Sequence, residues 1–283
     1  MDFYLCGEKG LAALQYALEF GFEVENLIVA KDDGLDDQAY LKILNLASSS
    51  GLQIHSRDLF FENSNIAIAV GWKWLITLDY ERLYVIHDSL LPKYRGWNPL
   101  VSALQNGDTE IGVTLILADA GIDTGPIVNQ IEIPISYPIT IREAIQKVLG
   151  AIGVILKNFK QLNMNHPSTL TIQDESKATY SLWRDKYDYF IDWTCSARRI
   201  VRFIDSLSEP YDGACSTLQG VDVRIFNAHE VSDLNIVNRQ PGKIWRITRE
   251  GPIVVCGSGL LQLRKIRAEG EDLKLSRIRQ RFQ

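Results

Sequence analysis

The sequence has little of what disulfide-rich and metal-binding proteins require. Among 283 residues there are only four cysteines and four histidines, and no two cysteines form a Cys-x-x-Cys pair. The histidines also lack the His-x-x-x-His spacing of helical zinc sites. We therefore expect no disulfide framework and no bound metal, and the free thiols indicate a reducing, cytoplasmic environment.

Long hydrophobic runs and an excess of basic residues are absent as well. No apolar run approaches the roughly 18 residues that span a bilayer. The amino terminus lacks the basic and apolar regions of a signal peptide, so no membrane association is expected. The formal net charge of −5 disfavours a broad nucleic-acid-binding surface, which usually belongs to a basic domain.

What is present is an alternation of apolar strands and amphipathic helices over residues 1–162. Strands are expected at 3–6, 24–30, 52–55, 66–70, 83–87, 112–117 and 127–135, and helices at 11–20, 38–48, 98–106 and 140–161. This alternation predicts an α/β fold with a Rossmann-like, doubly wound, mostly parallel sheet.

The pattern changes in the last third of the chain. Residues 163–179 are polar and contain Pro167, so they are interpreted as a linker. From 180 to 283, one helix is followed by short strands separated by Gly- and Pro-containing turns. These features predict a second domain, a small mostly-β, OB-like barrel.

Two loops carry the most specific signals. His87 follows the apolar residues 83–86 and opens a Pro- and Gly-containing loop, and Asp123 lies in a second such loop at 119–126. Either residue alone would more commonly be structural, but both follow strands of one predicted sheet, at the edge where open α/β sheets bind ligands. A carboxylate beside an imidazole favours the cation and fixes its tautomer. We predict that His87 and Asp123 stabilise a developing oxyanion and move a proton.

Other chemistries fit the sequence less well. A Ser-His-Asp hydrolase would need a nucleophile elbow, but no Gly-x-Ser-x-Gly occurs and Ser89 follows His87 too closely. The turn predicted at residues 7–10 is not a Gly-x-Gly-x-x-Gly loop. Lys9 could nevertheless meet a phosphate at the start of the following helix, and it is retained as a candidate substrate-binding residue.

At these loops the sequence resembles a known family. The segment His87-Asp88-Ser89-Leu90-Leu91-Pro92-Lys93-Tyr94-Arg95-Gly96 resembles the H-x-S-L-L-P-x-[YW]-R-G signature of formyltransferases that use 10-formyltetrahydrofolate. Residues 112–126 resemble that family's G-V-T…D-x-G-x-D-x-G motif, and the separation of 123 − 87 = 36 residues also fits. Residues 191–193, 197–200 and 211–214 resemble the C-terminal domain shared by methionyl-tRNA and sugar formyltransferases.

The resemblance implies a catalytic domain at 1–162, a linker at 163–179 and a C-terminal domain at 180–283. It also implies that the formyl group of 10-formyltetrahydrofolate passes to an amine, leaving tetrahydrofolate, with His87 at the oxyanion and Asp123 holding the imidazole and taking the amine proton. The residues that it implies for the folate are Trp74, Leu75, Ile76, Ser89, Leu90, Leu91, Pro92, Asp119, Ala120, Gly121 and Ile122.

One residue departs from the family pattern. The family has Asn-x-His, in which the Asn donates to the oxyanion, whereas this chain has Val85-Ile86-His87. Loss of one such donor costs about 2.7–4 kcal/mol in the transition state. Either another donor replaces it, with Asn98 and Lys73 as candidates, or the protein is slow, or it is a non-catalytic relative that binds folate or a nucleotide sugar.

The acceptor amine is less constrained. Methionyl-tRNA enzymes carry a basic insertion after the second strand, but the matching segment here, 31–37, is short and acidic and would repel phosphates. A basic tail points the other way; it contains Arg264, Lys265, Arg267, Lys274, Arg277, Arg279 and Arg281. The resemblance favours a nucleotide-linked amino-dideoxy sugar, used for surface polysaccharide such as lipopolysaccharide, with methionyl-tRNA as the alternative.

Four residues are candidates for contacting that acceptor: Lys9, Arg95, Trp97 and Asn98. The basic ones could meet the phosphates of the nucleotide, and a structural role for Arg95 is the equal alternative. The resemblance alone suggests a homodimer.

Overall fold

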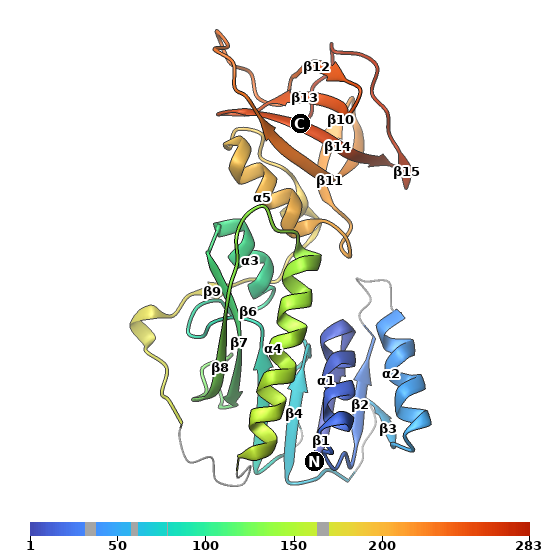
Figure 1. The fold of residues 1–283 in the computed structure, drawn as a ribbon, viewed down its shortest axis with the longest axis vertical. Coiled ribbons are helices and arrows are strands. Elements are labelled where there is room, and N and C mark those ends of the chain that lie inside the picture. Colours follow the sequence, from blue (N-terminus) through green and yellow to red (C-terminus); the bar gives the residue numbers. More distant parts are fainter. Residues whose placement is uncertain (32–37, 58–61, 78, 163–169) are drawn as a thin grey trace. The chain divides into compact units, whose positions relative to one another are not determined.

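The computed structural model describes residues 1–31, 38–57, 62–77, 79–162 and 170–283. These residues form two compact units (Figure 1). The first contains residues 1–100, 110–134 and 145–182, and the second contains 101–109, 135–144 and 183–283. The units therefore do not follow the chain in order, because two short segments before position 145 cluster with the C-terminal part.

The first unit is built on a seven-stranded sheet with the order β3-β2-β1-β4-β5-β7-β8. Its strands are β1 (Asp2–Cys6), β2 (Leu27–Ala30), β3 (Ile54–Ser56), β4 (Ile66–Val70), β5 (Arg82–His87), β7 (Glu110–Leu117) and β8 (Ile127–Pro134). The five strands from β3 to β5 are parallel, and β7 and β8 are antiparallel to their neighbours. The predicted mostly parallel α/β sheet is confirmed.

One face of this sheet carries the helices α1 (Gly7–Glu19), α2 (Gln38–Ser49) and α4 (Ile141–Gln161), as Figure 1 shows. Phe159 of α4 lies 4.6 Å, ring to ring, from Tyr84 of β5. Gly153 allows α1 to approach, since a Cβ there would come within 2.6 Å of the Tyr16 ring. A capping box begins α4, because Thr140 and Glu143 exchange side-chain-to-backbone hydrogen bonds.

The opposite face is covered differently. Its core cluster consists of Tyr4, Ile28, Ala67 and Ala69, and the residues packed against it are Trp72, Ile76, Tyr80, Leu83 and Val85. These covering residues come from the segment after β4 and from β5, not from a helix. In the described residues, this cluster is thus packed by aromatic and aliphatic side chains of the segment after β4 and of a neighbouring strand.

Two local boundaries differ from the sequence prediction. The turn expected at residues 7–10 is the first turn of α1, since Gly10 packs directly on Leu5 and the chain enters the helix at once. The second strand begins at Leu27 rather than at position 24. Of the acidic segment 31–37, all but Lys31 lies outside the described residues.

The second unit contains a closed β-structure. Helix α5 (Ala197–Leu207) precedes five strands in the order β10-β11-β14-β13-β12, and β15 (Glu271–Asp272) pairs with β14. The five strands are β10 (Ala214–Leu218), β11 (Val221–Val231), β12 (Ile244–Thr248), β13 (Gly251–Val255) and β14 (Leu260–Ala268). The C-terminal residues join the two edge strands, because Gln283 exchanges two 2.8 Å backbone hydrogen bonds with Thr217 while Phe282 donates to Gly242 beside β12. This closure fits the small barrel predicted from the sequence.

The predicted linker is only partly a connection. Residues 163–169 lie outside the described residues, but residues 170–182, which we call the strap, pack on the first unit. Thr171 and Ile127 exchange backbone hydrogen bonds of 2.8 and 2.9 Å. Strand β9 (Tyr180–Ser181) then pairs with β6 (Arg95–Gly96), so the strap runs directly beside the loop that begins at His87.

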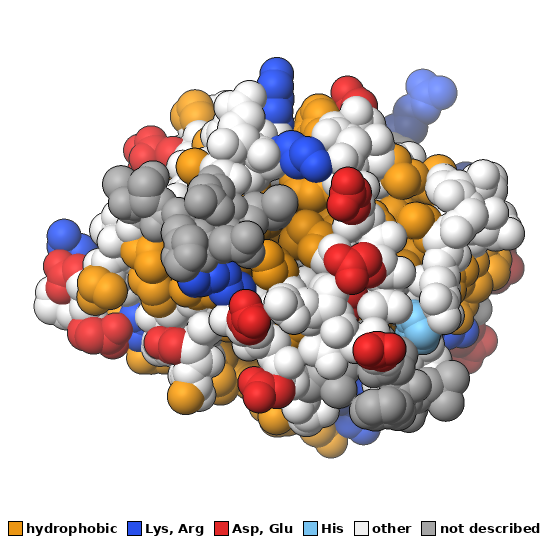
Figure 2. All heavy atoms as spheres, turned by 90° about the horizontal axis from the view of Figure 1, so that it is seen from below, with side chains coloured by type: hydrophobic (Ala, Val, Ile, Leu, Met, Phe, Trp, Pro, Cys, Tyr) orange, Lys and Arg blue, Asp and Glu red, His pale blue; other side chains and the backbone are white. Residues whose placement is uncertain are grey.

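Two features of the described residues concern membranes and surface charge. No helix in the described part of the chain has the length and apolar character needed to cross a membrane. Acidic and basic side chains are interspersed over the face drawn in Figure 2, without a continuous basic surface there.

Helix α3 (Pro99–Asn106) and the short 3-10 helices at Glu175–Lys177 and Lys186–Tyr189 complete the regular structure of the described residues.

Candidate active site

His87 is the last residue of β5 and its side chain is almost fully buried, with 8% exposed. Its Nε2 atom lies 2.9 Å from the carbonyl oxygen of Tyr94. Its Nδ1 atom lies 3.5 Å from Oδ2 of Asp123. The structure therefore brings together the two residues that the sequence predicted as a pair.

Both ring nitrogens of His87 face oxygen atoms that can only accept a hydrogen bond. A neutral imidazole has a single N–H and would leave one of these contacts unfavourable, whereas the imidazolium donates in both directions. The contact to Tyr94 is of ordinary length, while the contact to Asp123 is long. Nδ1 is thus the more weakly engaged donor and the one that could turn to a bound molecule.

Asp123 adopts the left-handed conformation, with φ of 54°. Its Oδ2 atom accepts a 2.8 Å hydrogen bond from the Gly96 N–H. Within the described residues Oδ1 accepts no hydrogen bond, and the side chain is 16% exposed. One carboxylate oxygen is therefore used to hold the group in place, and the other can accept a proton.

The loop from Asp88 to Gly96, which we call the histidine loop, is fixed by hydrogen bonds within itself and to neighbouring strands. Ser89 Oγ donates to the Lys93 carbonyl at 2.7 Å. The fully buried Thr114 of β7 donates to the Ser89 carbonyl at 2.6 Å, and Gln130 of β8 donates to the Leu91 carbonyl at 3.0 Å. This arrangement buries the side chains of Ser89 and Leu91. They therefore stabilise the loop and present little surface to a ligand.

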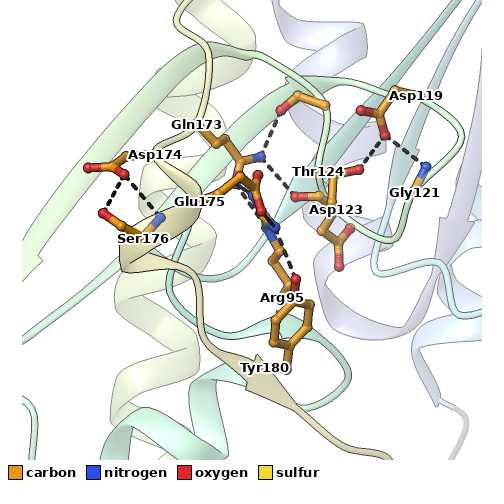
Figure 3. Close-up of polar contacts among 11 residues, drawn as sticks. Arg95, Asp119, Gly121, Asp123, Thr124, Gln173, Asp174, Glu175, Ser176 and Tyr180 are labelled. Carbon is orange, nitrogen blue, oxygen red and sulfur yellow. Dashed lines mark hydrogen bonds and ion pairs between the residues drawn. The ribbon is translucent and has the colours of Figure 1, made fainter.

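The loop from Asp119 to Gly125, which we call the aspartate loop, is held by the strap (Figure 3). Gln173 is 6% exposed, and its Nε2 atom donates to the carbonyls of Asp123 at 2.8 Å and Gly125 at 2.7 Å. Its Oε1 atom accepts from Nε and Nη2 of Arg95 at 3.1 and 2.9 Å. The amide therefore bridges Arg95 of the histidine loop and the backbone of the aspartate loop.

Arg95 is fully buried and its guanidinium is engaged at every nitrogen. Besides Gln173, it donates to both carboxylate oxygens of Glu175, at 2.8 and 2.6 Å, and to the Tyr180 hydroxyl at 3.2 Å. Hydrogen bonding to Glu175 raises the pKa of Arg95 and lowers the pKa of Glu175. Arg95 thus has no exposed surface, which corrects the expectation that it binds the phosphates of a substrate.

Lys9, the other basic candidate, is also paired. It lies in the first turn of α1 and forms an ion pair with Asp88, the residue after His87. Burial disfavours ionisation of Asp88, but Lys9 and His87 outweigh it and hold the pKa of Asp88 below its ordinary value. Lys9 would have to exchange this carboxylate for a phosphate in order to bind a nucleotide.

Trp97 and Asn98 directly follow Gly96 and reach the surface. The side chain of Trp97 is 39% exposed, and Asn98 is exposed with φ of 51°. Val85, where the family donor is missing, packs against the apolar cluster on the sheet face opposite the helices.

The folate-binding residues expected from the resemblance fall into two sets. One set is exposed: Leu75 is 88% exposed, Ile122 is 55% exposed, and Ala120 and Gly121 are also exposed. Asp119 shapes this turn by accepting from the Gly121 N–H at 3.0 Å and from the Thr124 hydroxyl.

The other set is at least partly covered. Ser89 and Leu91 are buried, while Leu90 and Pro92 are intermediate. Ile76 packs on the apolar cluster. Trp74 lies edge-on to Trp72 at 5.1 Å, with the Arg57 guanidinium 4.7 Å from its ring centre, so its described contacts are not with either loop.

Sequence reasoning missed Gln173, Glu175, Tyr180 and Thr114. Gln173 and Glu175 lie in a segment whose polar composition indicates a linker, Tyr180 is the first residue of the predicted second domain, and nothing in their spacing points to the aspartate loop. Thr114 had a signal, since it is the one polar residue in the apolar strand 111–117 and buried hydroxyls require a partner. In the described residues no group of three or more His, Cys, Asp or Glu side chains is arranged to hold a metal ion.

Comparison with known proteins gives matches along both parts of the chain. Residues 63–154 match the formyl transferase family, and residues 184–278 match the formyl transferase C-terminal domain. The methionyl-tRNA formyltransferase of Fervidobacterium nodosum is 30% identical over 213 residues, which cover 74% of this chain and 67% of that protein. Against the proteins of the same name from Ralstonia nicotianae and Roseiflexus, the match spans only 56% of their length.

Two solved structures share the fold over almost their entire length. The sugar 3N-formyl transferase WlaRD, solved with dTDP and 5-N-formyl-THF, superimposes with a TM-score of 0.68 at 21% identity, covering 98% of this chain and 99% of that one. The N-formyltransferase from Helicobacter canadensis, solved with folinic acid and dTDP-3-aminofucose, gives 0.67 at 19% identity, covering 96% and 100%.

Proposed function

The chain belongs to the formyl transferase family, and we propose that it transfers a formyl group from 10-formyltetrahydrofolate to the amine of a nucleotide-linked amino-dideoxy sugar. The observation that carries the proposal is the His87–Asp123 pair, which lies at the end of β5 with one donor and one acceptor atom only loosely engaged. Formyl transfer to an amine needs a hydrogen-bond donor for the carbonyl oxygen and a base for the amine proton.

The pair can supply both requirements. When the amine nitrogen attacks the formyl carbon, negative charge develops on the formyl oxygen, and the Nδ1–H of His87 can donate to it. The amine must lose a proton as the new C–N bond forms, and Oδ1 of Asp123 can accept it. The bond to N10 of the folate then breaks, N10 takes a proton, and the products are tetrahydrofolate and an N-formyl sugar. The Gly96 and Tyr94 contacts keep the pair oriented throughout.

The exposed residues beside the pair suit the folate. A pterin ring has a fixed hydrogen-bonding edge and apolar faces, so it needs accessible backbone groups together with apolar side chains. Residues 119–122 expose backbone, and Leu75 and Ile122 expose apolar surface. We place the folate between these two segments, with no metal involved.

Two observations favour a small sugar nucleotide over a tRNA as the acceptor. The sugar formyltransferases superimpose on this chain with TM-scores of 0.67 and 0.68, against 0.56 for the methionyl-tRNA formyltransferase from Clostridium thermocellum. The basic residues Arg264, Lys265 and Arg267 are each paired with a carboxylate, from Glu250, Glu209 or Asp272, so they do not form a free phosphate-binding surface. We assign the exposed Trp97 and Asn98 to the sugar, and surface polysaccharide would be its destination.

The proposal is tested by incubating the protein with 10-formyltetrahydrofolate and a panel of dTDP-, UDP- and GDP-linked amino sugars, while following tetrahydrofolate release. Turnover on at least one sugar is expected. Methionyl-tRNA remains the alternative because the curated relatives carry that name. Formylation of initiator methionyl-tRNA, with tight salt-sensitive binding, and none of the sugars, would replace the sugar proposal.

Val85 favours a second candidate, a binding protein with little activity. The substitution Val85→Asn separates the two. If a donor is missing, the amide should raise kcat by about 10²-fold or more. If the site is complete without it, kcat should stay the same or fall, because an amide is then placed against the apolar cluster of Trp72 and Ile76.

A further inference from the structure

We propose that Gln173 is a positioning residue that holds the Asp123 carboxylate at His87 by clamping the backbone of the aspartate loop. The inference rests on the proposed function only for its kinetic consequence. Its physical basis is the set of contacts that the strap makes with both loops (Figure 3).

The aspartate loop needs an external restraint. Asp123 has φ of 54°, a conformation that costs a residue with a Cβ energy and persists only where surrounding contacts enforce it. The Asp119 side chain shapes the first half of the turn through Gly121 and Thr124. The carbonyls of Asp123 and Gly125, in the second half, receive their hydrogen bonds from the two N–H groups of Gln173.

The orientation of the Gln173 amide is itself fixed. Its oxygen faces two donors of Arg95, and its nitrogen faces two carbonyl oxygens. A flipped amide would oppose donor to donor and acceptor to acceptor at all four contacts. Gln173 and Arg95 are buried, so water cannot easily replace these bonds.

The clamp is connected to the reacting pair through three consecutive residues. The Tyr94 carbonyl accepts from His87, the Arg95 side chain holds Gln173, and the Gly96 N–H donates to Asp123. Backbone pairing of β6 with β9 fixes this tripeptide to the strap. Releasing Gln173 would therefore free the backbone of Asp123 while leaving its carboxylate attached by a single hydrogen bond.

Two variants test this inference. Gln173→Ala removes the whole amide. Gln173→Glu keeps an acceptor for Arg95, and thereby the fold, but replaces both N–H donors by an oxygen facing two carbonyls. Asp174→Ala is the matched control, because the side-chain contacts of Asp174 within the described residues are with Ser176 and Lys177 of the same exposed turn. The first measurement is hydrogen–deuterium exchange of the peptides covering residues 94–97 and 119–126, which needs no substrate.

We expect faster exchange in both peptides for both Gln173 variants and unchanged exchange for the control. In the active enzyme, kcat should fall by about 10²-fold, as for a reacting group displaced by about 1 Å, while KM for 10-formyltetrahydrofolate changes little. Wild-type exchange or wild-type kcat in Gln173→Glu would overturn the inference. If the unmodified protein turns over no acceptor, the proposed function fails, and the exchange result still decides the clamp.

Discussion

The histidine loop has supports of its own in addition to the strap, whereas the second half of the aspartate loop is held by the strap through a residue 50 positions away. Ser89, Thr114 and Gln130 satisfy the histidine loop from within the sheet and the loop itself, and β9 of the strap pairs with its last two residues. Gln173 reaches the aspartate loop from the strap. The strap thus contacts both loops, and a change far from His87 and Asp123 can alter their separation.

The largest effect is expected at the pair itself. Asp123→Asn keeps an oxygen for the Gly96 N–H and tolerates a positive φ, but an amide cannot accept the amine proton. We expect kcat to fall by about 10²–10⁴-fold, as for loss of a general base, with the fold intact by circular dichroism. Asp119→Asn is the control, since its oxygen can still cap the turn; equal losses in both variants would contradict the role assigned to Asp123.

The same Thr→Val substitution, made in β7 beside the histidine loop and within the aspartate loop, should separate the two kinds of support. Thr114→Val removes a fully buried hydroxyl and leaves the Ser89 carbonyl and the Leu91 N–H without their partner. The free energy of unfolding should fall by about 1–3 kcal/mol. Thr124→Val removes one contact to the exposed Asp119. It should change the free energy of unfolding by about 0.5 kcal/mol or less. Urea unfolding measures both, and similar values would remove the distinction between the loops.

The smallest effect is expected at the outer end of the strap. Glu175 has a pKa lowered chiefly by its hydrogen bond to Arg95. A carboxyl whose pKa is lowered on folding adds stability above its unfolded pKa of about 4.3, and this stability is lost as the pH falls through the folded value. Glu175→Gln should therefore be less stable than the wild type at pH 7 and indistinguishable from it near pH 2. Thermal unfolding of both proteins across this pH range, at low salt, tests this pH dependence. A stability difference between them that grows on acidification would refute it.

The sequence predicted the parts of the site that depend on local pattern. An apolar run ending in His87 and a Pro- and Gly-containing loop place an imidazole at the end of a strand, and the strand pattern around residues 110–135 places Asp123 beside it. The capping residues Thr140 and Glu143 likewise mark the start of α4, because helix ends are satisfied by neighbours in sequence.

Predictions that required long-range contacts failed or were incomplete. From the sequence, Arg95 could be a phosphate ligand or a structural residue, because it is basic and lies within the motif; the structure buries it against Gln173, Glu175 and Tyr180. The polar segment after α4 indicated a linker, since nothing in its composition shows which backbone it will contact. Burial and pairing are properties of two segments at once, and a pattern within one segment does not contain them.

By itself, the sequence determined the alternating α/β part, the short strands that follow it and the choice of His87 and Asp123 as the candidate pair, because periodicity and turn chemistry act over a few residues. Tertiary structure alone decided that Arg95 is internal, that the strap holds the aspartate loop and that residues 281–283 close the barrel. Each of these outcomes satisfies buried donors and acceptors with partners distant in sequence, and only the folded chain brings such partners together.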